Sequence, residues 1–339
     1  MLILGIESSC DETGAAIISA TYKSKKVKLL SNIVASSLAL HSKTGGIIPE
    51  NAAREQIKYI NPVINQSLKE TGITIDKIDA IAVTQGPGLI GSLLVGVETA
   101  KTLSYTLGKP LIPTNHLIGH IYANFIDQGK SKEIRFPAIG LIVSGGHTDL
   151  ILIKKHGSIK WLGGTRDDAA GEALDKIGRL LNLPYPGGPY IEKAARSGNK
   201  KKFNFPSPLL NSNDFDFSFS GLKTATTREI SKNKIDNQTV SDISYSVQKA
   251  IINVLIKKTI NAAKKYNAKS ILLGGGVAAN ETLKEQLGSQ ITKLGLRTSL
   301  FVPKKKFCTD NAAMIAAAAN FNYKEENWWK LEADPSLYF

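Results

Sequence analysis

Short apolar segments separated by small and polar residues open the chain and recur near its middle. Residues 2–18 consist of an apolar stretch, a polar turn at residues 8–14 and a second apolar stretch from Ala15, which predicts two strands joined as a hairpin. Residues 140–153 repeat this order and can be laid on residues 5–18 without a gap. We expect two duplicated α/β halves that each open with such a hairpin. The alternative is a chance likeness between two apolar hairpins with small residues in their turns.

Helical and strand patterns alternate along the rest of the chain, which is typical of an α/β fold. Strands are predicted at residues 80–84, before Thr114 and at 270–273, and helices at 49–68, after the Gly-rich turn at 85–92, after Arg166, at 242–266 and from about residue 309. No linker rich in Pro or Ser divides the chain. The predicted domains are a first lobe at residues 1–115, a second lobe at 116–309, and a C-terminal segment at 310–339 that packs back on the first lobe.

The composition is that of a globular protein large enough for two lobes, with 339 residues, 42% of them apolar and 21% charged. The net charge of +14 would attract a polyanion such as nucleic acid, although a general excess of lysine would produce the same charge. Two cysteines, Cys10 and Cys308, are too few for a disulfide framework. The N-terminal apolar run is short and soon followed by acidic residues, unlike a signal peptide, and no segment approaches the roughly 20 apolar residues of a membrane span. We expect a protein of the cytoplasm, or of an organelle matrix if a leader has been removed, with no membrane partner.

Two histidines stand four positions apart in the segment NHLIGH. On a helix that begins after Asn115, His116 and His120 would lie on one face, a spacing that suits two imidazoles on one metal ion. The alternative is a pair of histidines satisfied by other contacts. A zinc peptidase is disfavoured because Leu117 stands where that signature has its general-base glutamate.

Asp310, in the segment CTDNAAMIA, is the candidate third ligand. Two imidazoles and one carboxylate leave coordination positions open for substrate oxygen atoms, and the set is compatible with iron or zinc. The plain alternative is an acidic residue in the first turn of a helix, where it favours the helix dipole.

Glycine-rich turns suggest a nucleotide site. Ser144, Gly145 and Gly146 are expected at the tip of the second hairpin, where free backbone N–H groups can hold a phosphate, and GGGVAAN at residues 274–280 leads from a strand into a helix. Tight turns without a ligand are the alternative for both segments. Gly187 and Gly188, in YPGGP, would let the backbone approach a ribose or base.

Carboxylates add two further candidate features. Asp168, Glu172 and Asp175 occur at positions i, i+4 and i+7, which predicts three carboxylates along one helical face; a solvated acidic face is the alternative. Asp11 and Glu12 stand at the tip of the first hairpin, where a carboxylate could position a metal ion, a water or a nucleophile, or could simply stabilise an Asx-type turn.

Ten motifs occur in an order and spacing that together resemble one family. They are GIESSCDETG, GGIIPE, TQGPGLIGSLLVG, NHLIGH, LIVSGGHT, DDAAGEALDKIGRLL, YPGGP, DFSFSGLKTA, GGGVAAN and CTDNAAMIA. Between residue 2 and about residue 319 the chain resembles the tRNA N6-adenosine threonylcarbamoyltransferase family. The resemblance implies an actin-like, Hsp70-like and sugar-kinase-like ATPase fold, with two duplicated α/β lobes around a central cleft.

The resemblance also implies a reaction and a set of residues. The reaction is transfer of the threonylcarbamoyl group from threonylcarbamoyl-AMP to N6 of adenosine 37, in tRNAs that read codons beginning with A, with release of AMP. Asp11 matches the family's active-site aspartate, and the metal, Fe²⁺ in the first place and Zn²⁺ as the alternative, would be held by His116, His120 and Asp310. The implied nucleotide-binding residues are Ile142, Val143, Ser144, Gly145, Gly146, Asp175, Gly188, Glu192 and Asn280.

The implied partners are tRNA, a paralogous protein of the same fold and a small ATPase helper. Lysines at residues 200–202 or 304–306 would meet tRNA phosphates. Thr44 and Gln56 depart from the family pattern, which often has Tyr and His there; because both lie outside the metal and nucleotide motifs, we expect them to affect contacts with a partner or tRNA more than the reaction. The alternative function is a nucleotide-binding ATPase or scaffold of the same fold, since its hairpins and glycine turns would serve ATP equally well.

Overall fold

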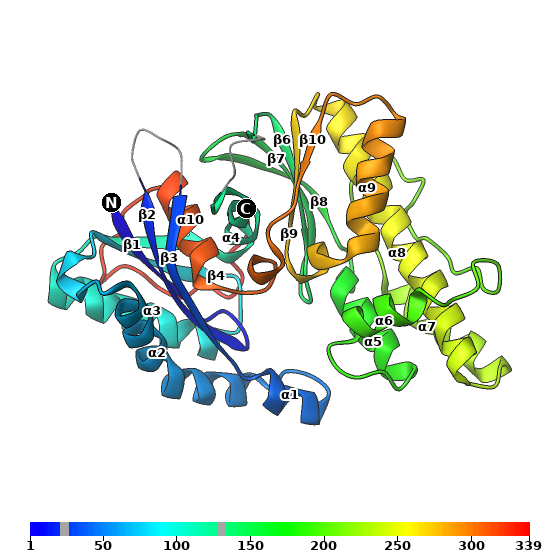
Figure 1. The fold of residues 1–339 in the computed structure, drawn as a ribbon, viewed down its shortest axis with the longest axis horizontal. Coiled ribbons are helices and arrows are strands. Elements are labelled where there is room, and N and C mark those ends of the chain that lie inside the picture. The colour runs from blue at the N-terminus through cyan, green and yellow to red at the C-terminus, as the bar shows by residue number, and fades with distance from the viewer. Residues whose placement is uncertain (21–26, 128–132) are drawn as a thin grey trace. The chain divides into compact units, whose positions relative to one another are not determined.

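The computed structural model describes residues 1–20, 27–127 and 133–339, which form two compact units (Figure 1). The first unit comprises Met1–Glu133 and Pro303–Phe339, and the second comprises Ile134–Val302. Each unit is built on its own five-stranded mixed sheet and has its own apolar core. None of the described helices is long and apolar enough to cross a membrane.

The first unit has the strand order β3-β2-β1-β4-β5. Its strands are β1 (Leu2–Glu7), β2 (Glu12–Ala20), β3 (Val27–Ser36), β4 (Ala80–Gly86) and β5 (Leu111–Asn115). β1 pairs antiparallel with β2 and parallel with β4, and β4 pairs parallel with β5. The carboxyl ends of β1, β4 and β5 therefore meet at one edge of the sheet, where ligand sites of α/β proteins usually form.

Helices cover both faces of this sheet. α2 (Pro49–Thr71) and α3 (Ile90–Leu107) share a core with Leu4 and Ile6 of β1. Gly5 points to the other face because side chains alternate along a strand, and there it meets α10 (Ala312–Phe321) so closely that a Cβ would lie 2.4 Å from the Ala312 carbonyl oxygen. The remaining helices of this unit are α1 (Leu38–Thr44), α4 (His116–Tyr122) and the short 3₁₀ turns η1 (Ile75–Lys77), η2 (Ala123–Phe125) and η4 (Lys305–Phe307).

The second unit repeats this plan with the strand order β10-β9-β6-β7-β8. Its strands are β6 (Ala138–Val143), β7 (Thr148–Lys155), β8 (Ser158–Gly164), β9 (Ser270–Gly274) and β10 (Ser299–Phe301). The pairings β6–β7 and β7–β8 are antiparallel, and β6–β9 and β9–β10 are parallel, as in the first unit. Its helices are α5 (Ala170–Leu180), α6 (Gly187–Ala195), α7 (Ser220–Lys232), α8 (Asn237–Lys265), α9 (Glu281–Lys293) and the 3₁₀ turn η3 (Gly276–Ala279). The predicted duplication, with a hairpin opening each half, is confirmed.

The unit boundaries differ from the boundary expected near residue 115. The chain leaves the first unit after Glu133 and returns to it at Pro303. α4 stays with the first unit because it packs against α10, and Gly119 permits this contact: a Cβ there would lie 2.8 Å from the Ile315 side chain. The boundary predicted from the sequence therefore assigned residues 116–133 and 303–309 to the wrong lobe. No linker rich in Pro or Ser marks the true boundary in the sequence.

Candidate functional site

Polar side chains gather where the parallel strands of the first unit end. Glu7 is the last residue of β1, Thr84 lies near the end of β4, and His116 begins α4 directly after β5. The Asn115 side chain caps α4 by accepting a hydrogen bond from the Ile118 N–H at 3.1 Å. The cap fixes the first turn of α4, so that His116 and His120 project from one face of the helix, as their spacing predicted.

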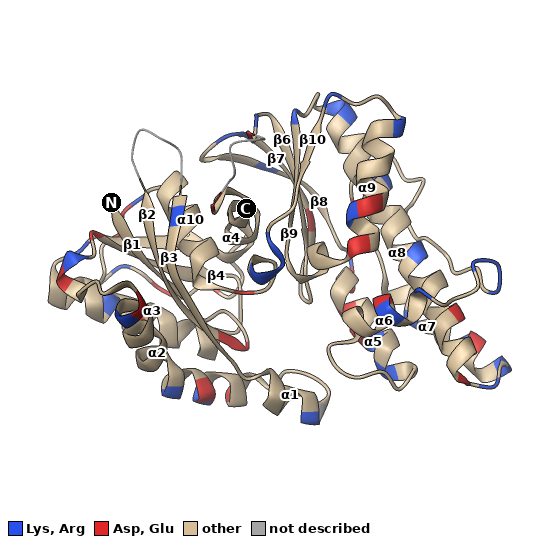
Figure 2. Cartoon of the chain, viewed as in Figure 1, with Lys and Arg blue, Asp and Glu red and all other residues tan. Residues whose placement is uncertain are grey.

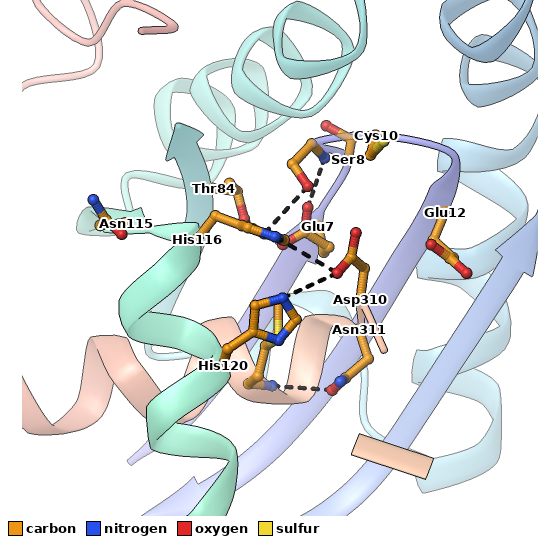
Figure 3. Close-up of polar contacts among 12 residues, drawn as sticks. Glu7, Ser8, Cys10, Glu12, Thr84, Asn115, His116, His120, Asp310 and Asn311 are labelled. Atoms are coloured by element: carbon orange, nitrogen blue, oxygen red, sulfur yellow. Dashed lines mark hydrogen bonds and ion pairs between the residues drawn. The ribbon is translucent and has the colours of Figure 1, made fainter. Parts of the chain in front are cut away.

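Asp310 completes a group of three potential metal ligands with these histidines (Figure 3). Its Oδ1 atom lies 3.5 Å from His116 Nε2 and 3.2 Å from His120 Nε2. Asp310 precedes the first turn of α10 rather than lying in it, because Asn311 is the N-cap and accepts from the Met314 N–H at 3.1 Å. Both imidazoles are buried, and one ligand atom from each of the three residues lies within 4.8 Å of the others.

Glu7 orients the first of these histidines, and it was not among the residues selected from the sequence. Its Oε2 lies 3.1 Å from His116 Nδ1 and accepts a hydrogen bond from Thr84 Oγ1 at 2.7 Å, while its Oε1 accepts from the Ser9 N–H at 2.6 Å. When the imidazole is neutral, a proton held on Nδ1 leaves Nε2, which faces Asp310, with a lone pair for a metal ion. Carboxylates commonly support metal-binding histidines in this way. An acidic residue at the end of an apolar strand is the sequence signal that could have identified Glu7.

His120 supplies the observation that tests whether a metal ion fits. Both of its ring nitrogens are buried, and neither makes a hydrogen bond within the described residues despite the 3.2 Å approach to Asp310. Leaving a buried polar atom unsatisfied is costly, and coordination of a cation would remove that cost at Nε2. Burial lowers the pKa of His116, but Asp310 and Glu7 outweigh burial and raise this pKa to about 9. The site therefore favours positive charge, and the residues present fit a metal ion.

Asp11 and Glu12 bring two further carboxylates toward Asp310. Asp11 lies in the turn that follows β1, and Glu12 is the first residue of β2. We call residues 8–12 the 8–12 turn. Burial, then Asp310 and Asp11, raises the pKa of Glu12 to about 10, and burial and Asp310 also raise the pKa of Asp11. Three carboxylates so close together are strongly stabilised by a cation. The 8–12 turn thus places the predicted active-site aspartate beside the candidate metal ligands.

Gln56 supports the 8–12 turn from α2. Its Nε2 atom donates to the carbonyl oxygens of Ser8, Cys10 and Glu12 at 3.2, 2.9 and 3.2 Å, and the side chain is buried. Gln56 departs from the family pattern and lies outside the metal and nucleotide motifs, yet its one amide group holds the backbone on both sides of Asp11. The other departure, Thr44, ends α1, and its side chain lies outside the described part of the chain.

The predicted phosphate loop forms the β6–β7 turn of the second unit. Ile142 and Val143 end the buried strand β6. The turn closes through a hydrogen bond from the Ser144 N–H to the His147 carbonyl oxygen at 2.9 Å and one from the His147 N–H to Ser144 Oγ at 3.1 Å. A Cβ on Gly145 or Gly146 would meet no described atom within 4 Å, so the tip is open to a ligand.

Close backbone packing brings two other segments against this turn. At Gly171, in the first turn of α5, a Cβ would lie 2.4 Å from the Ser144 carbonyl oxygen. Gly275, which precedes η3, has a φ of +92° and would place a Cβ 2.3 Å from the Val143 carbonyl oxygen. Glycine is required at both positions. The turn, the amino end of α5 and the β9–η3 connection therefore form one continuous surface.

Asp175 links α5 to the amino end of α6. Its Oδ1 accepts from the Gly187 N–H at 2.7 Å, and the neighbouring Gly188 lies in the first turn of α6 rather than in a loop. Burial is the main cause of the raised pKa of Asp175. The three predicted carboxylates do not form one face. Asp168 precedes α5. Lys176 Nζ forms ion pairs with Asp168 Oδ1 at 2.7 Å and with Glu172 Oε1 at 2.9 Å.

Glu192 and Asn280 meet at the amino end of α9. Glu192 Oε1 accepts from the Glu281 N–H at 2.8 Å, and Asn280 Oδ1 accepts from the Leu283 N–H at 2.9 Å while its amide donates to Gln248 at 3.0 Å. These hydrogen bonds occupy both carboxamide atoms of Asn280, so its side chain acts as a helix cap in this structure. All predicted nucleotide-binding residues of the second unit thus lie at the β6–β7 turn or near the amino ends of α5, α6 and α9, where helix dipoles favour an anion.

Comparison with solved structures defines the class of fold. The chain superposes on HypF from T. kodakarensis with a TM-score of 0.63 at 14% identity, covering 95% of this chain and 47% of that one. It superposes on component A of (R)-2-hydroxyglutaryl-CoA dehydratase from Acidaminococcus fermentans with a TM-score of 0.53 at 14% identity, covering 94% and 98%. The predicted actin-like ATPase fold is confirmed.

Sequence comparison gives the family. Residues 28–317 match the profile of the TsaD family, described as tRNA N6-adenosine threonylcarbamoyltransferase. Curated proteins of that name from Thermosipho africanus and Moorella thermoacetica are each 48% identical over 339 residues, covering 99% of this chain and 99% and 96% of their own. The chain belongs to this family, as the ten motifs predicted.

Proposed function

We propose that this protein transfers the threonylcarbamoyl group of threonylcarbamoyl-AMP to N6 of adenosine 37, in tRNAs that read codons beginning with A. Membership of the family over nearly the whole chain supports this reaction. The observation that carries the proposal is the meeting of His116, His120 and Asp310 beside Asp11 at the end of one sheet. A phosphotransferase of the same fold would need magnesium on carboxylates and would not use paired imidazoles.

His116, His120 and Asp310 are the proposed ligands of one divalent metal ion, Fe²⁺ first and Zn²⁺ as the alternative. The ion would supply Lewis-acid polarisation of the carbonyl of the donor. Glu7 keeps the proton of His116 on Nδ1, and Asn115 and Asn311 fix the helix ends from which the ligands project. These contacts support a site that is formed before the ion binds.

The second unit is the proposed binding surface for the adenylate part of the donor. Its phosphate would lie against Ser144, Gly145 and Gly146, where the side-chain positions of the two glycines are open, and the adenosine near Gly188 and Asn280. The amino ends of α5, α6 and α9 add positive potential. Four other residues would act mainly by holding the surrounding backbone. Asp175 and Glu192 are hydrogen-bonded to helix amino ends, and Ile142 and Val143 end the buried strand that carries the turn.

Asp11 is the proposed catalytic residue. The N6 nitrogen forms a bond with the carbamoyl carbon, the bond from that carbon to the phosphate oxygen breaks, and AMP leaves with the bonding electrons. The Asp11 carboxylate orients N6 and accepts its proton. Ser37 holds the Asp11 carbonyl oxygen through its N–H at 3.1 Å and its hydroxyl at 2.8 Å, which fixes the backbone from which the carboxylate projects.

The proposal includes a cytoplasmic location and two protein partners, a paralogue of the same fold and a small ATPase helper. The direct test uses the protein with these partners, tRNA and the donor. Asp11→Ala should keep metal and donor binding but lose transfer, whereas Asp127→Ala, a carboxylate outside the site, should be close to wild type. Near-normal transfer by Asp11→Ala would remove Asp11 from the reaction. ATP hydrolysis by the protein alone, without the ATPase helper, combined with no transfer in the full reaction, would favour the rival ATPase.

A further inference from the structure

Three consecutive lysines stand just before the metal ligand Asp310. Lys304, Lys305 and Lys306 are all exposed, and they occupy the connection that leads from β10 to α10, where Figure 2 shows a blue stretch. We call residues 304–306 the lysine turn. It belongs to the same unit as the candidate metal centre.

The lysine turn is firmly anchored. The Phe307 N–H donates to the Lys304 carbonyl oxygen at 2.8 Å and the Cys308 N–H to that of Lys305 at 3.1 Å, which closes the 3₁₀ turn η4. Phe307 and Cys308 are buried directly behind it. The Asn311 amide, whose oxygen caps α10, donates to the Thr309 carbonyl oxygen at 2.8 Å. The backbone from the lysine turn to Asp310 is thus held at both ends, unlike a solvated lysine run in a loose loop.

The positive charges of the lysine turn are not neutralised within the protein. Lys58, Lys101 and Lys284 each pair with a carboxylate of their own helix. Among the described residues, no carboxylate lies within ion-pair distance of any of the three lysines of the turn; Lys306 instead lies over the Phe307 ring, 5.0 Å from its centroid. Exposed, unpaired cations on a rigid support attract an anion without first having to break internal ion pairs.

The position of the turn determines which anion fits. Asp310 stands four positions after Lys306, a distance of at most about 14 Å along the chain, and a lysine side chain is long and flexible. A nucleotide whose base reached the metal centre would carry its backbone phosphates at about this range. A single small anion would not need three adjacent lysines, whereas a nucleic-acid strand presents phosphates at regular intervals.

We propose that the lysine turn binds successive phosphates of the tRNA strand that flanks the reacting adenosine, and so positions N6 at the metal centre. This inference rests on the proposed function. It assigns to Lys304, Lys305 and Lys306 a positioning role that depends on charge and not on base sequence, because phosphate contacts fix register without reading bases.

The test compares two variants with the same loss of charge. The first is K304Q/K305Q/K306Q. The control, K69Q/K77Q/K324Q, changes three exposed lysines outside the lysine turn. Lys69 lies in the last turn of α2, Lys77 precedes β4, and Lys324 lies two residues before Glu326, which bridges to Leu111 at the start of β5. Affinity for a tRNA that reads codons beginning with A is measured between 50 and 200 mM salt, roughly the range in which phosphate contacts weaken measurably. Metal content and the thermal unfolding midpoint are measured on the same samples.

Loss of three phosphate contacts on a single strand should reduce the slope of log affinity against log salt by about 2. We expect this smaller slope only in K304Q/K305Q/K306Q, together with a rise in the KM for tRNA of about tenfold or more. The metal content of that variant should be unchanged. K304R/K305R/K306R keeps the three positive charges and should bind tRNA like the wild type. Equal effects of the first variant and the control, or no effect of either, would overturn the inference. The dependence of tRNA affinity on salt tests the role of the lysine turn even if the wild type makes no modified nucleoside. Absence of that nucleoside would count against the proposed function alone.

Discussion

Glu7→Gln is the substitution that most clearly separates orientation of a ligand from simple packing. The amide has the shape of the carboxylate but replaces one acceptor oxygen with a donor. In the wild type, the Ser9 nitrogen lies 2.6 Å from Glu7 Oε1. If the NH₂ group takes the place of Oε1, it faces the Ser9 N–H, and two donors oppose each other. If it takes the place of Oε2, it donates to His116 Nδ1, and the imidazole must carry its proton on Nε2. Either arrangement weakens the site, and the second removes the lone pair that faces Asp310.

The expected effect is a 10- to 100-fold loss of metal affinity, about 1.4 to 2.8 kcal/mol, the usual range for residues that support metal ligands. Competition between the protein and a chromophoric chelator for Zn²⁺ measures this affinity, and threonylcarbamoyl transfer should fall in parallel. Thermal unfolding of the metal-free protein shows whether the fold is intact.

Thr84→Val is the matched control for Glu7→Gln. It removes the hydrogen bond of 2.7 Å from Thr84 to Glu7 Oε2 but leaves the carboxylate facing His116, so its metal affinity should stay close to that of the wild type. The reasoning is refuted if Glu7→Gln binds Zn²⁺ as tightly as the wild type, or if both variants lose affinity equally.

Three other predictions concern the support of the two sites and the stability of the fold. Gln56→Ala removes the amide that holds three carbonyl oxygens of the 8–12 turn, and should lower the kcat of transfer several-fold while metal content, by elemental analysis, is retained. Gly171→Ala places a Cβ 2.4 Å from the Ser144 carbonyl oxygen, so donor affinity measured by calorimetry should fall, whereas Gly221→Ala, in open space, should not change it. Hydrogen bonds from Ser212 and Lys258 lower the pKa of Asp214 to about 2, and this stabilisation is present above the ordinary pKa of 3.8 and lost as the pH falls toward 2. The difference in urea midpoint between wild type and Asp214→Asn should therefore shrink between pH 5 and pH 2; a constant difference would contradict the assignment.

Much of the fold is readable because it rests on local periodicity. The two hairpins could be recognised from alternating apolar and polar stretches, and their likeness predicted the duplicated sheets. The edge strands β3, β8 and β10 were not predicted: β3 and β8 are only partly buried, and β10 has only three residues, so their hydrophobic pattern is weak. The boundary near residue 115 was misplaced because the packing of α4 on α10 joins segments far apart in sequence.

The candidate site divides in the same way between local and tertiary information. The spacing of His116 and His120 fixes their common face once α4 forms, so this pair could be predicted from a single turn of helix. The contacts made by Glu7 and Gln56 depend on pairing of strands and on the approach of α2, which no local pattern encodes. For Asp168, the local pattern predicted a relation that the structure does not have. The i, i+7 spacing places Asp168 on one helical face with Asp175 only if the helix extends to residue 168, but α5 begins at Ala170.

Mass spectrometry of nucleosides is the decisive measurement for the proposed reaction. Purified protein with bound metal would be incubated with tRNA, threonylcarbamoyl-AMP and both helper proteins, and the tRNA then digested to nucleosides. The proposal predicts N6-threonylcarbamoyladenosine at adenosine 37 with the wild type and none with Asp11→Ala. Absence of this nucleoside with the wild type, when metal and helpers are verified in the same reaction, would contradict the proposed function and favour a nucleotide-binding ATPase or scaffold.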